Sequence, residues 1–114
     1  MTLENMIRDQ ILFWLSAQGI FAWITDRTGT YDPVRKRFRT NKNKFRIRGV
    51  ADISGILPGG RALFIEVKTK TGKLSAHQKL FLVTAMRHGA VAFVARSVND
   101  AAARVLPLIE GRKQ

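Results

Sequence analysis

The sequence predicts an α/β fold in which a mixed sheet of about four strands is flanked by helices, in the order helix, three strands, helix, strand, helix. The chain opens with an amphipathic pattern of three- and four-residue spacing. Two apolar segments then flank a Leu-Pro-Gly-Gly turn at 57–60, and a helix-capping signal follows at Ser75. With 114 residues, 46% of them apolar, we expect one compact domain spanning 1–114.

The first predicted helix begins after Thr2, a good N-cap, and ends near Gln18, before Gly19. Its apolar face consists of Leu3, Ile7, Ile11, Trp14 and Leu15. Residues 20–25 are β-branched and aromatic, so we expect a buried strand there, leading into a turn-rich segment at 26–33.

Residues 35–48 form a basic run in which eight of fourteen side chains are Lys or Arg. No helical or strand period is present, so we expect an exposed loop or an edge hairpin that tracks DNA phosphates, although a solvated loop is the alternative. Phe38, Phe45 or Tyr31 could stack there on an unpaired base. The candidate DNA-binding residues are Arg35, Lys36, Arg37, Arg39, Lys42, Lys44, Arg46 and Arg48, continued by Lys70 and Lys73.

Residues 49–56 and 61–69 predict an antiparallel hairpin. With its turn centred on Gly59, Asp52 stands opposite Glu66 on one face of the sheet.

The second half of the chain predicts a helix, a strand and a helix. Ser75 and Gln78 form a capping box, and the helix after it carries a stripe of Leu80, Phe81, Thr84 and Ala85 before ending at His88 and Gly89. Residues 90–95 form a short apolar strand. Ser97 and Asp100 start a last helix, which we expect to stop or bend at Pro107.

Composition excludes several classes of protein. Without Cys there is neither a disulfide nor a thiolate metal site, and apolar stretches such as 11–15 and 90–95 are far shorter than a membrane span. A cytoplasmic protein without membrane contact is expected. The formal net charge of +12 indicates a polyanionic partner such as nucleic acid.

Between Pro33 and Asn99 the only acids are Asp52 and Glu66, among fifteen Lys and Arg. Glu66 and Lys68 share one strand face, and the Val67 carbonyl between them offers a further oxygen ligand. Two carboxylates about 5 Å apart repel each other, which Mg²⁺ or Mn²⁺ would offset. The alternative is that Lys68 simply neutralises the pair.

These motifs resemble the VRR-NUC branch of the PD-(D/E)xK nucleases. The matching segments are Gly49-Val50-Ala51-Asp52-Ile53, Phe64-Ile65-Glu66-Val67-Lys68-Thr69 and Gly72-Lys73-Leu74-Ser75 with Gln78. The resemblance implies a restriction-endonuclease-like core with a site formed by Glu4, Asp52, Glu66, Lys68 and Gln78. Ala51 stands where the motif usually has Pro, so we expect an altered path into the strand but retained metal binding.

The resemblance further implies a metal-dependent, structure-selective DNA endonuclease that leaves 5′-phosphate and 3′-hydroxyl ends. A bare domain is similar to the standalone phage-type members, which implies a homodimer that resolves Holliday junctions. We expect apolar helix surfaces carrying Phe13, Trp14 or Phe81 to hold the dimer. The alternatives are a flap or sequence-tolerant duplex nuclease, a non-catalytic basic nucleic-acid-binding protein, and a small subunit of a larger assembly.

Several candidate residues also have structural explanations. An acid such as Glu4 is favoured in any first helical turn by the helix dipole, and Gln78 is explained by its capping box. His77 lies beside the motif and could contact the scissile phosphate, but the alternative is an ordinary polar residue in the first turn of a helix. Trp14 and Trp23 fall on apolar faces and are expected in the core, in preference to base-stacking platforms.

Overall fold

The computed structural model describes residues 1–25, 30–32, 34–39 and 45–110. The elements in chain order are α1 (Leu3–Ala17), β1 (Phe21–Ile24), β2 (Thr30–Asp32), β3 (Arg37–Arg39), β4 (Ile53–Ile56), β5 (Ala62–Val67), α2 (Ala76–Arg87), β6 (Val91–Ala95) and α3 (Val98–Ile109). Within these residues no helix has the length and apolar character needed to cross a membrane.

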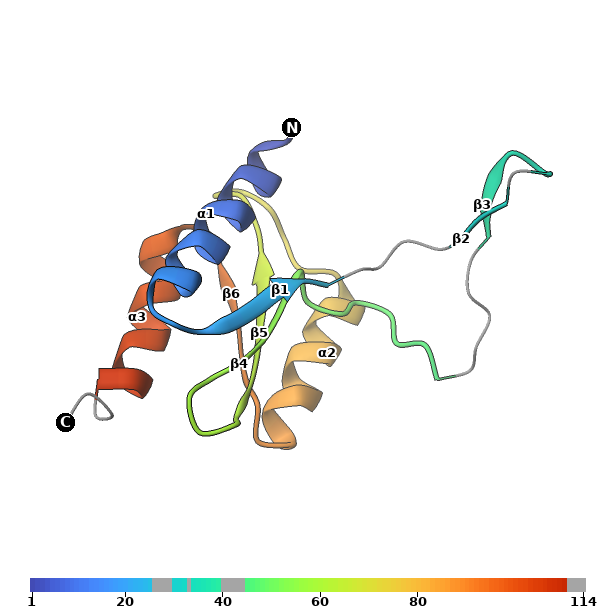
Figure 1. Cartoon of the computed structure of the whole chain (residues 1–114). Helices are drawn as coiled ribbons and strands as arrows, with labels where there is room; N and C mark the ends of the chain where they lie inside the picture. The colour runs from blue at the N-terminus through green and yellow to red at the C-terminus, as the bar shows by residue number, and fades with distance from the viewer. Residues whose placement is uncertain (26–29, 33, 40–44, 111–114) are drawn as a thin grey trace.

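The main body is a mixed four-stranded sheet in the order β1-β4-β5-β6. β4 pairs antiparallel with β1 and β5, whereas β5 and β6 are parallel. Helices α1 and α3 cover one face of this sheet and α2 covers the other (Figure 1). The predicted fold class and the predicted order of these elements are confirmed.

The β4–β5 hairpin has the predicted register. Ile53 pairs with Ile65 and Ile56 with Ala62, as a turn centred on Gly59 requires. Gly59 and Gly60 have φ angles of 99° and 98°, a region that glycine occupies without steric cost. This register brings the start of β4 next to the end of β5, and the two motif carboxylates lie there.

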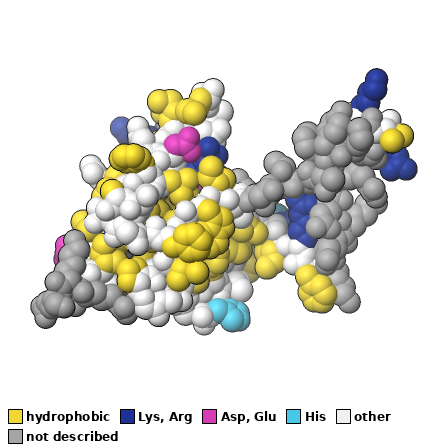
Figure 2. Space-filling model, in the orientation of Figure 1, with side chains coloured by type: hydrophobic (Ala, Val, Ile, Leu, Met, Phe, Trp, Pro, Cys, Tyr) yellow, Lys and Arg dark blue, Asp and Glu magenta, His cyan; other side chains and the backbone are white. Residues whose placement is uncertain are grey.

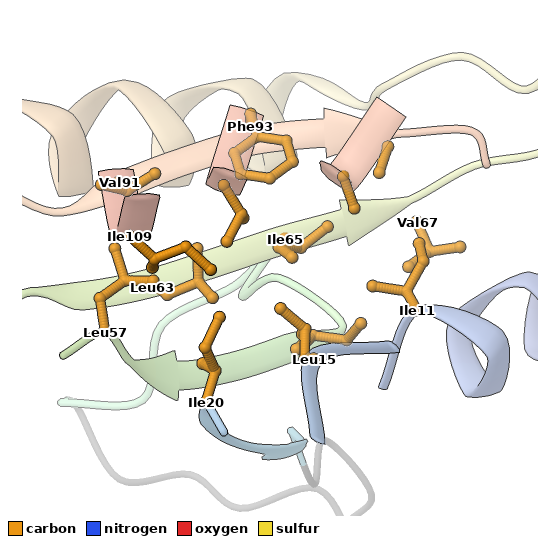
Figure 3. Packing of buried hydrophobic residues seen from close by; sticks show 14 residues of the cluster. Ile11, Leu15, Ile20, Leu57, Leu63, Ile65, Val67, Val91, Phe93 and Ile109 are labelled. Carbon is orange, nitrogen blue, oxygen red and sulfur yellow. The ribbon is translucent and has the colours of Figure 1, made fainter. Parts of the chain in front are cut away.

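The larger core cluster lies between the sheet and the helices α1 and α3 (Figure 3). Alternate β5 residues Leu63, Ile65 and Val67 point into it and are fully buried. Ile11 from α1 and Val105 from α3 meet them there. The intervening β5 residues therefore face α2.

The smaller cluster lies under α2 and joins Ala51, Leu82 and Ala92, with Phe64 and Phe81 packed edge to face. The predicted α2 stripe is partly wrong, because Leu80 and Thr84 are exposed. Side chains at 78, 81, 82 and 85 share one helical face, which turns 80 and 84 toward solvent.

Of the two outcomes expected at Pro107, a stop is wrong, because α3 continues through Pro107 to Ile109. Because proline has no N–H, Pro107 removes one main-chain hydrogen bond, and this loss falls in the last turn of the helix. Val105 and Ile109 are both buried against the sheet and keep this turn helical.

The strand predicted at 20–25 is present as β1, but the prediction that it is buried is wrong. β1 lies at the edge of the sheet, and its Phe21, Trp23 and Ile24 side chains are exposed. The core assignment of Trp23 is thereby overturned, whereas Trp14 does pack against the larger cluster. Trp23 is exposed because α2 packs against β5 and β6 and does not extend over β1.

The basic run contains β3, which pairs with β2 in a separate two-stranded sheet. Figure 1 draws this hairpin to one side of the main body, consistent with the expected exposed loop or hairpin. Arg35, Lys36, Arg46 and Arg48 are exposed. The candidates Lys42 and Lys44 lie outside the described residues.

Candidate active site

Asp52 lies just before β4 and is held from both sides. Its main-chain oxygen accepts a hydrogen bond from the Thr25 N–H at 2.8 Å, which ties it to the end of β1. Its carboxylate Oδ2 accepts one from the Val67 N–H, also at 2.8 Å. Val67 lies beyond the last paired residues of the hairpin, so the Asp52 side chain continues the connection between the strands. Only 7% of Asp52 is exposed, and its orientation is fixed.

Glu66 projects from β5 toward α2 and is 1% exposed, the most buried charged residue of the described chain. Its Oε2 accepts a hydrogen bond from Gln78 Nε2 at 2.9 Å. The Lys68 ammonium lies 3.6 Å from the same oxygen, an ion pair between neighbours on one strand face. A carboxylate buried to this degree needs such partners, because burial without them strongly disfavours its charged form.

Gln78 connects the start of α2 with this carboxylate. Its Oε1 accepts the Ser75 N–H at 2.8 Å, while its own N–H donates to Ser75 Oγ at 3.1 Å, which is the predicted capping box. The other end of the amide, Nε2, reaches Glu66. The two interpretations of Gln78, helix cap and site residue, are therefore compatible in one side chain.

Gly49 brings the segment before Asp52 against the start of α2. Its φ is 75°, and a Cβ added there would lie 2.4 Å from the carbonyl carbon of His77 and 2.6 Å from the Gln78 nitrogen. No side chain fits in that space. Ala51, two residues later, is fully buried beneath α2, so the residue that replaces the usual Pro is accommodated in the core.

The loop after Lys68 is organised by Arg96, which the sequence patterns did not single out. One guanidinium nitrogen, Nη1, donates to the carbonyls of Thr69 at 2.6 Å, Gly72 at 2.7 Å and Lys70 at 3.3 Å. Lys70 and Lys73 are exposed on and beside this loop. Ala95 pairs with Val67, so Arg96, the next residue, lies beside the chain that leaves β5. The parallel β5–β6 register could therefore have predicted the position of Arg96.

A hydroxyl pair next to Asp52 has no signal in the sequence. Thr25 Oγ1 and Ser54 Oγ lie 2.6 Å apart, joining the edge strand β1 to β4. The contact requires the β1–β4 register, in which Trp23 pairs with Ser54, and no local pattern predicts that pairing.

Two further candidates are less closely integrated. Glu4 is half-buried in the first turn of α1, and His77 is exposed in the first turn of α2. In the part of the chain that the structure describes, no three His, Cys, Asp or Glu side chains gather closely enough to hold a metal ion. Glu4 therefore does not form such a group with Asp52 and Glu66.

The donor set nevertheless suits a hard divalent cation. Two carboxylates of low exposure lie just before β4 and near the end of β5, and the Lys68 ammonium lies 3.6 Å from the second of them. Mg²⁺ is commonly held by one or two carboxylates, with water and substrate phosphate completing its shell. The side chains present therefore fit a metal that is shared between protein and substrate.

Comparison with known proteins agrees with this geometry. The model of one family, the VRR-NUC domain, matches residues 5–99 of the 114. Asp52, Glu66, Lys68 and Gln78 fall within the matched range, whereas Glu4 lies one residue before it. No curated protein and no solved structure matches the chain.

Proposed function

The chain belongs to the VRR-NUC domain family, and we propose that its PD-(D/E)xK nuclease centre is the cluster of Asp52, Glu66, Lys68 and Gln78. The family assignment makes the protein a nuclease, a hydrolase acting on DNA. The proposed centre rests on the surroundings of Glu66 Oε2, which accepts a hydrogen bond from Gln78 Nε2 and lies 3.6 Å from Lys68 Nζ. The Asp52 carboxylate is held beside it by the N–H of Val67, the next residue along. We take residues 1–114 as one nuclease domain.

In this proposal the reaction depends on Mg²⁺ or Mn²⁺, held by the Asp52 and Glu66 carboxylates and the Val67 carbonyl, with Glu4 as a further candidate. When bound, the cation supplies charge neutralisation at the scissile phosphate and lowers the pKa of water. Within the described residues no third His, Cys, Asp or Glu joins these two acids, which favours a site whose remaining positions are filled by water and DNA oxygens.

The chain's own residues position the reactants. Lys68 Nζ, only partly exposed and 3.6 Å from Glu66 Oε2, is placed to hold the attacking water and stabilise charge that develops in the transition state. Gln78 keeps Glu66 in one rotamer by its hydrogen bond. Attack of the water oxygen on the phosphorus forms a new P–O bond and breaks the bond between phosphorus and O3′. The water loses a proton and the departing O3′ takes one from solvent, which leaves a 5′-phosphate and a 3′-hydroxyl end.

We further propose that this endonuclease selects DNA by shape and acts as a homodimer on Holliday junctions, with flap and duplex DNA as alternative substrates. A second copy needs an apolar surface, because two chains of net charge +12 repel each other. Trp14 and Phe81 pack within the chain, but Phe13 is 79% exposed. It shares one side of α1 with the exposed Leu3 and Met6, so we assign the dimer contact to this stripe.

Phe13→Glu tests the dimer by sedimentation at moderate salt, with Phe21→Glu as a matched control on another exposed aromatic. We expect Phe13→Glu to give a monomer that no longer makes symmetric cuts on a fixed junction, and Phe21→Glu to stay dimeric. A wild-type chain that is monomeric at all concentrations would refute the dimer without affecting the nuclease centre.

The nuclease centre is tested with Asp52→Asn and Glu66→Gln on a panel of junction, flap, duplex and single-stranded DNA with Mg²⁺ or Mn²⁺. Each change should abolish cleavage, because it removes an oxygen ligand's charge. Binding of DNA in metal-free buffer should stay equal or become tighter, since one negative charge is lost. Wild-type turnover by either variant would overturn the assignment, and a chain that binds but never cuts would favour the non-catalytic alternative.

A further inference from the structure

The exposed aromatic pair on β1 has no role in the proposed chemistry. Phe21 is 68% exposed and Trp23 42%, and their ring centroids lie 4.9 Å apart. Both extend from an edge strand, where Figure 2 shows hydrophobic side chains gathered over the region that Figure 1 labels β1. Two large neighbouring aromatic rings left in water mark a binding surface more often than a random surface feature.

The pair lies on the same face of the sheet as the nuclease centre. Trp23 pairs with Ser54, and Ser54 pairs with Phe64, which packs against α2. Side chains directly opposite in paired strands share a face, so Trp23 also lies on the α2 side. Glu66, two residues beyond Phe64, projects to that side as well.

The pair is also close to the centre. Trp23 is separated from Asp52 by one strand spacing across the sheet and two residues along it, which in ordinary sheet geometry places their Cα atoms about 8 Å apart. Thr25 and Ser54, whose hydroxyls lie 2.6 Å apart, fill the other two corners of this block. Trp23, the Thr25–Ser54 hydroxyl pair and the Asp52 carboxylate therefore lie in this order on one face of the sheet.

We propose that Phe21 and Trp23 form a stacking platform for an unpaired nucleobase of the DNA next to the scissile phosphate. The proposal rests on the proposed nuclease function for the position of the DNA. Every base offers a π-face to an aromatic side chain, but within a duplex that face is already stacked on its neighbours. The platform therefore selects branched or single-stranded DNA over continuous duplex.

A nucleic acid is a better occupant for this surface than a second copy of the chain. The formal charge of +12 attracts a polyanion and repels another copy, and the exposed Arg46 and Arg48 precede the segment that leads into Asp52. Thr25, whose hydroxyl pairs with that of the buried Ser54, is only partly buried and can offer a hydrogen bond to a sugar or phosphate, which an apolar protein interface would leave buried. The α1 stripe provides a separate surface for self-association.

The experiment follows Trp23 fluorescence in the full-length chain. Trp14→Phe leaves Trp23 as the only tryptophan, and Glu66→Gln in the same chain keeps the DNA intact during titration. We expect saturable quenching by a flap carrying unpaired bases and little quenching by a fully paired duplex of equal charge. Quenching by both to the same extent, or by neither, would overturn the platform.

Affinity measurements supply the second arm. Trp23→Ala should weaken binding to flap DNA about tenfold, a loss of the size expected for one base–aromatic stack, and leave duplex binding within twofold. Trp23→Tyr should restore most of the flap affinity, and Leu108→Ala, a change at an exposed apolar residue on α3, should alter neither affinity. Equal losses on flap and duplex DNA, or conversion of a dimer to a monomer by Trp23→Ala, would contradict the proposal.

Failure of the platform can be told from failure of the nuclease assignment. If Trp23 is unaffected by DNA but Asp52→Asn still abolishes cleavage, the nuclease centre stands and the platform is wrong. If Trp23 is quenched selectively by unpaired DNA while the chain cuts none of the panel, base stacking stands and the nuclease proposal fails.

Discussion

Glu66 and Gln78 are joined by a hydrogen bond of 2.9 Å between Nε2 of the glutamine and Oε2 of the glutamate, across the boundary between β5 and α2. The same glutamine caps its own helix through its Oε1 and its main-chain N–H. Movement of the start of α2 therefore also moves a partner of the buried acid Glu66. Folding of the helix and orientation of the proposed metal ligand are coupled through one side chain.

Gln78→Ala should reduce both stability and cleavage, whereas Ser75→Ala should reduce stability alone. Each change removes part of the capping box and should lower the free energy of unfolding by about 1 kcal/mol. Only Gln78→Ala removes the donor to Glu66, so its cleavage rate should fall even well below its melting temperature. Urea unfolding and single-turnover cleavage test this, and equal rates for the two variants would show Gln78 to be only a cap.

Lys68→Ala should lower kcat by roughly 100-fold or more while leaving KM nearly unchanged, because the ammonium is expected to act on the transition state. Lys70→Ala is the matched control, since Lys70 is exposed two residues later and is expected to contact only DNA phosphates. That variant should raise KM and spare kcat. Recovery of the Lys68→Ala rate at saturating metal would make Lys68 a structural counter-ion.

Gly49→Ala should destabilise the chain more than Gly19→Ala, although the two glycines have nearly equal φ angles of 75° and 77°. A positive φ costs alanine about 1 kcal/mol at either position. At Gly49 the new Cβ also meets the His77 main chain at 2.4 Å, whereas nothing lies within 4 Å at Gly19. We expect roughly 1–3 kcal/mol of additional loss for Gly49→Ala, together with slower cleavage because Gln78 is displaced. Equal melting temperatures would contradict this packing.

Neutralising Arg35, Lys36, Arg37 and Arg39 together should weaken binding to every DNA shape and flatten its salt dependence. Each phosphate contact that is lost lowers the slope of log affinity against log salt by roughly one. Replacing Arg61 and Arg87 provides the control, since Arg61 lies just before β5 and Arg87 ends α2, at the opposite ends of these elements from Glu66 and Gln78. An unchanged slope for the fourfold variant would assign the run to solvent.

Much of the site could be predicted because its determinants are local. The Gly59 turn fixes the β4–β5 register, and the spacing of Ser75 and Gln78 fixes the start of α2. Period-two alternation then places Glu66 and Lys68 on one face. The α2 stripe was predicted partly wrongly because packing against the sheet buries Leu82 and leaves Leu80 exposed. The end of α3 was predicted too early because burial of Ile109 keeps the last turn helical.

The sequence by itself determined the elements of the main sheet and its helices, the hairpin register and the positions of the motif acids, since these depend on periodicity, turn chemistry and capping over a few residues. It did not determine β2, which lies in a segment expected to be turn-rich. Only the tertiary structure decided that α2 lies over β5 and β6 but leaves β1 open, and with it whether Trp23 is buried or exposed. It likewise decided that Asp52 bonds to Val67, that Arg96 holds the 69–72 loop and that Gly49 must lack a side chain. These contacts join segments far apart in the chain, and an apolar strand has the same local pattern whether or not a helix covers it.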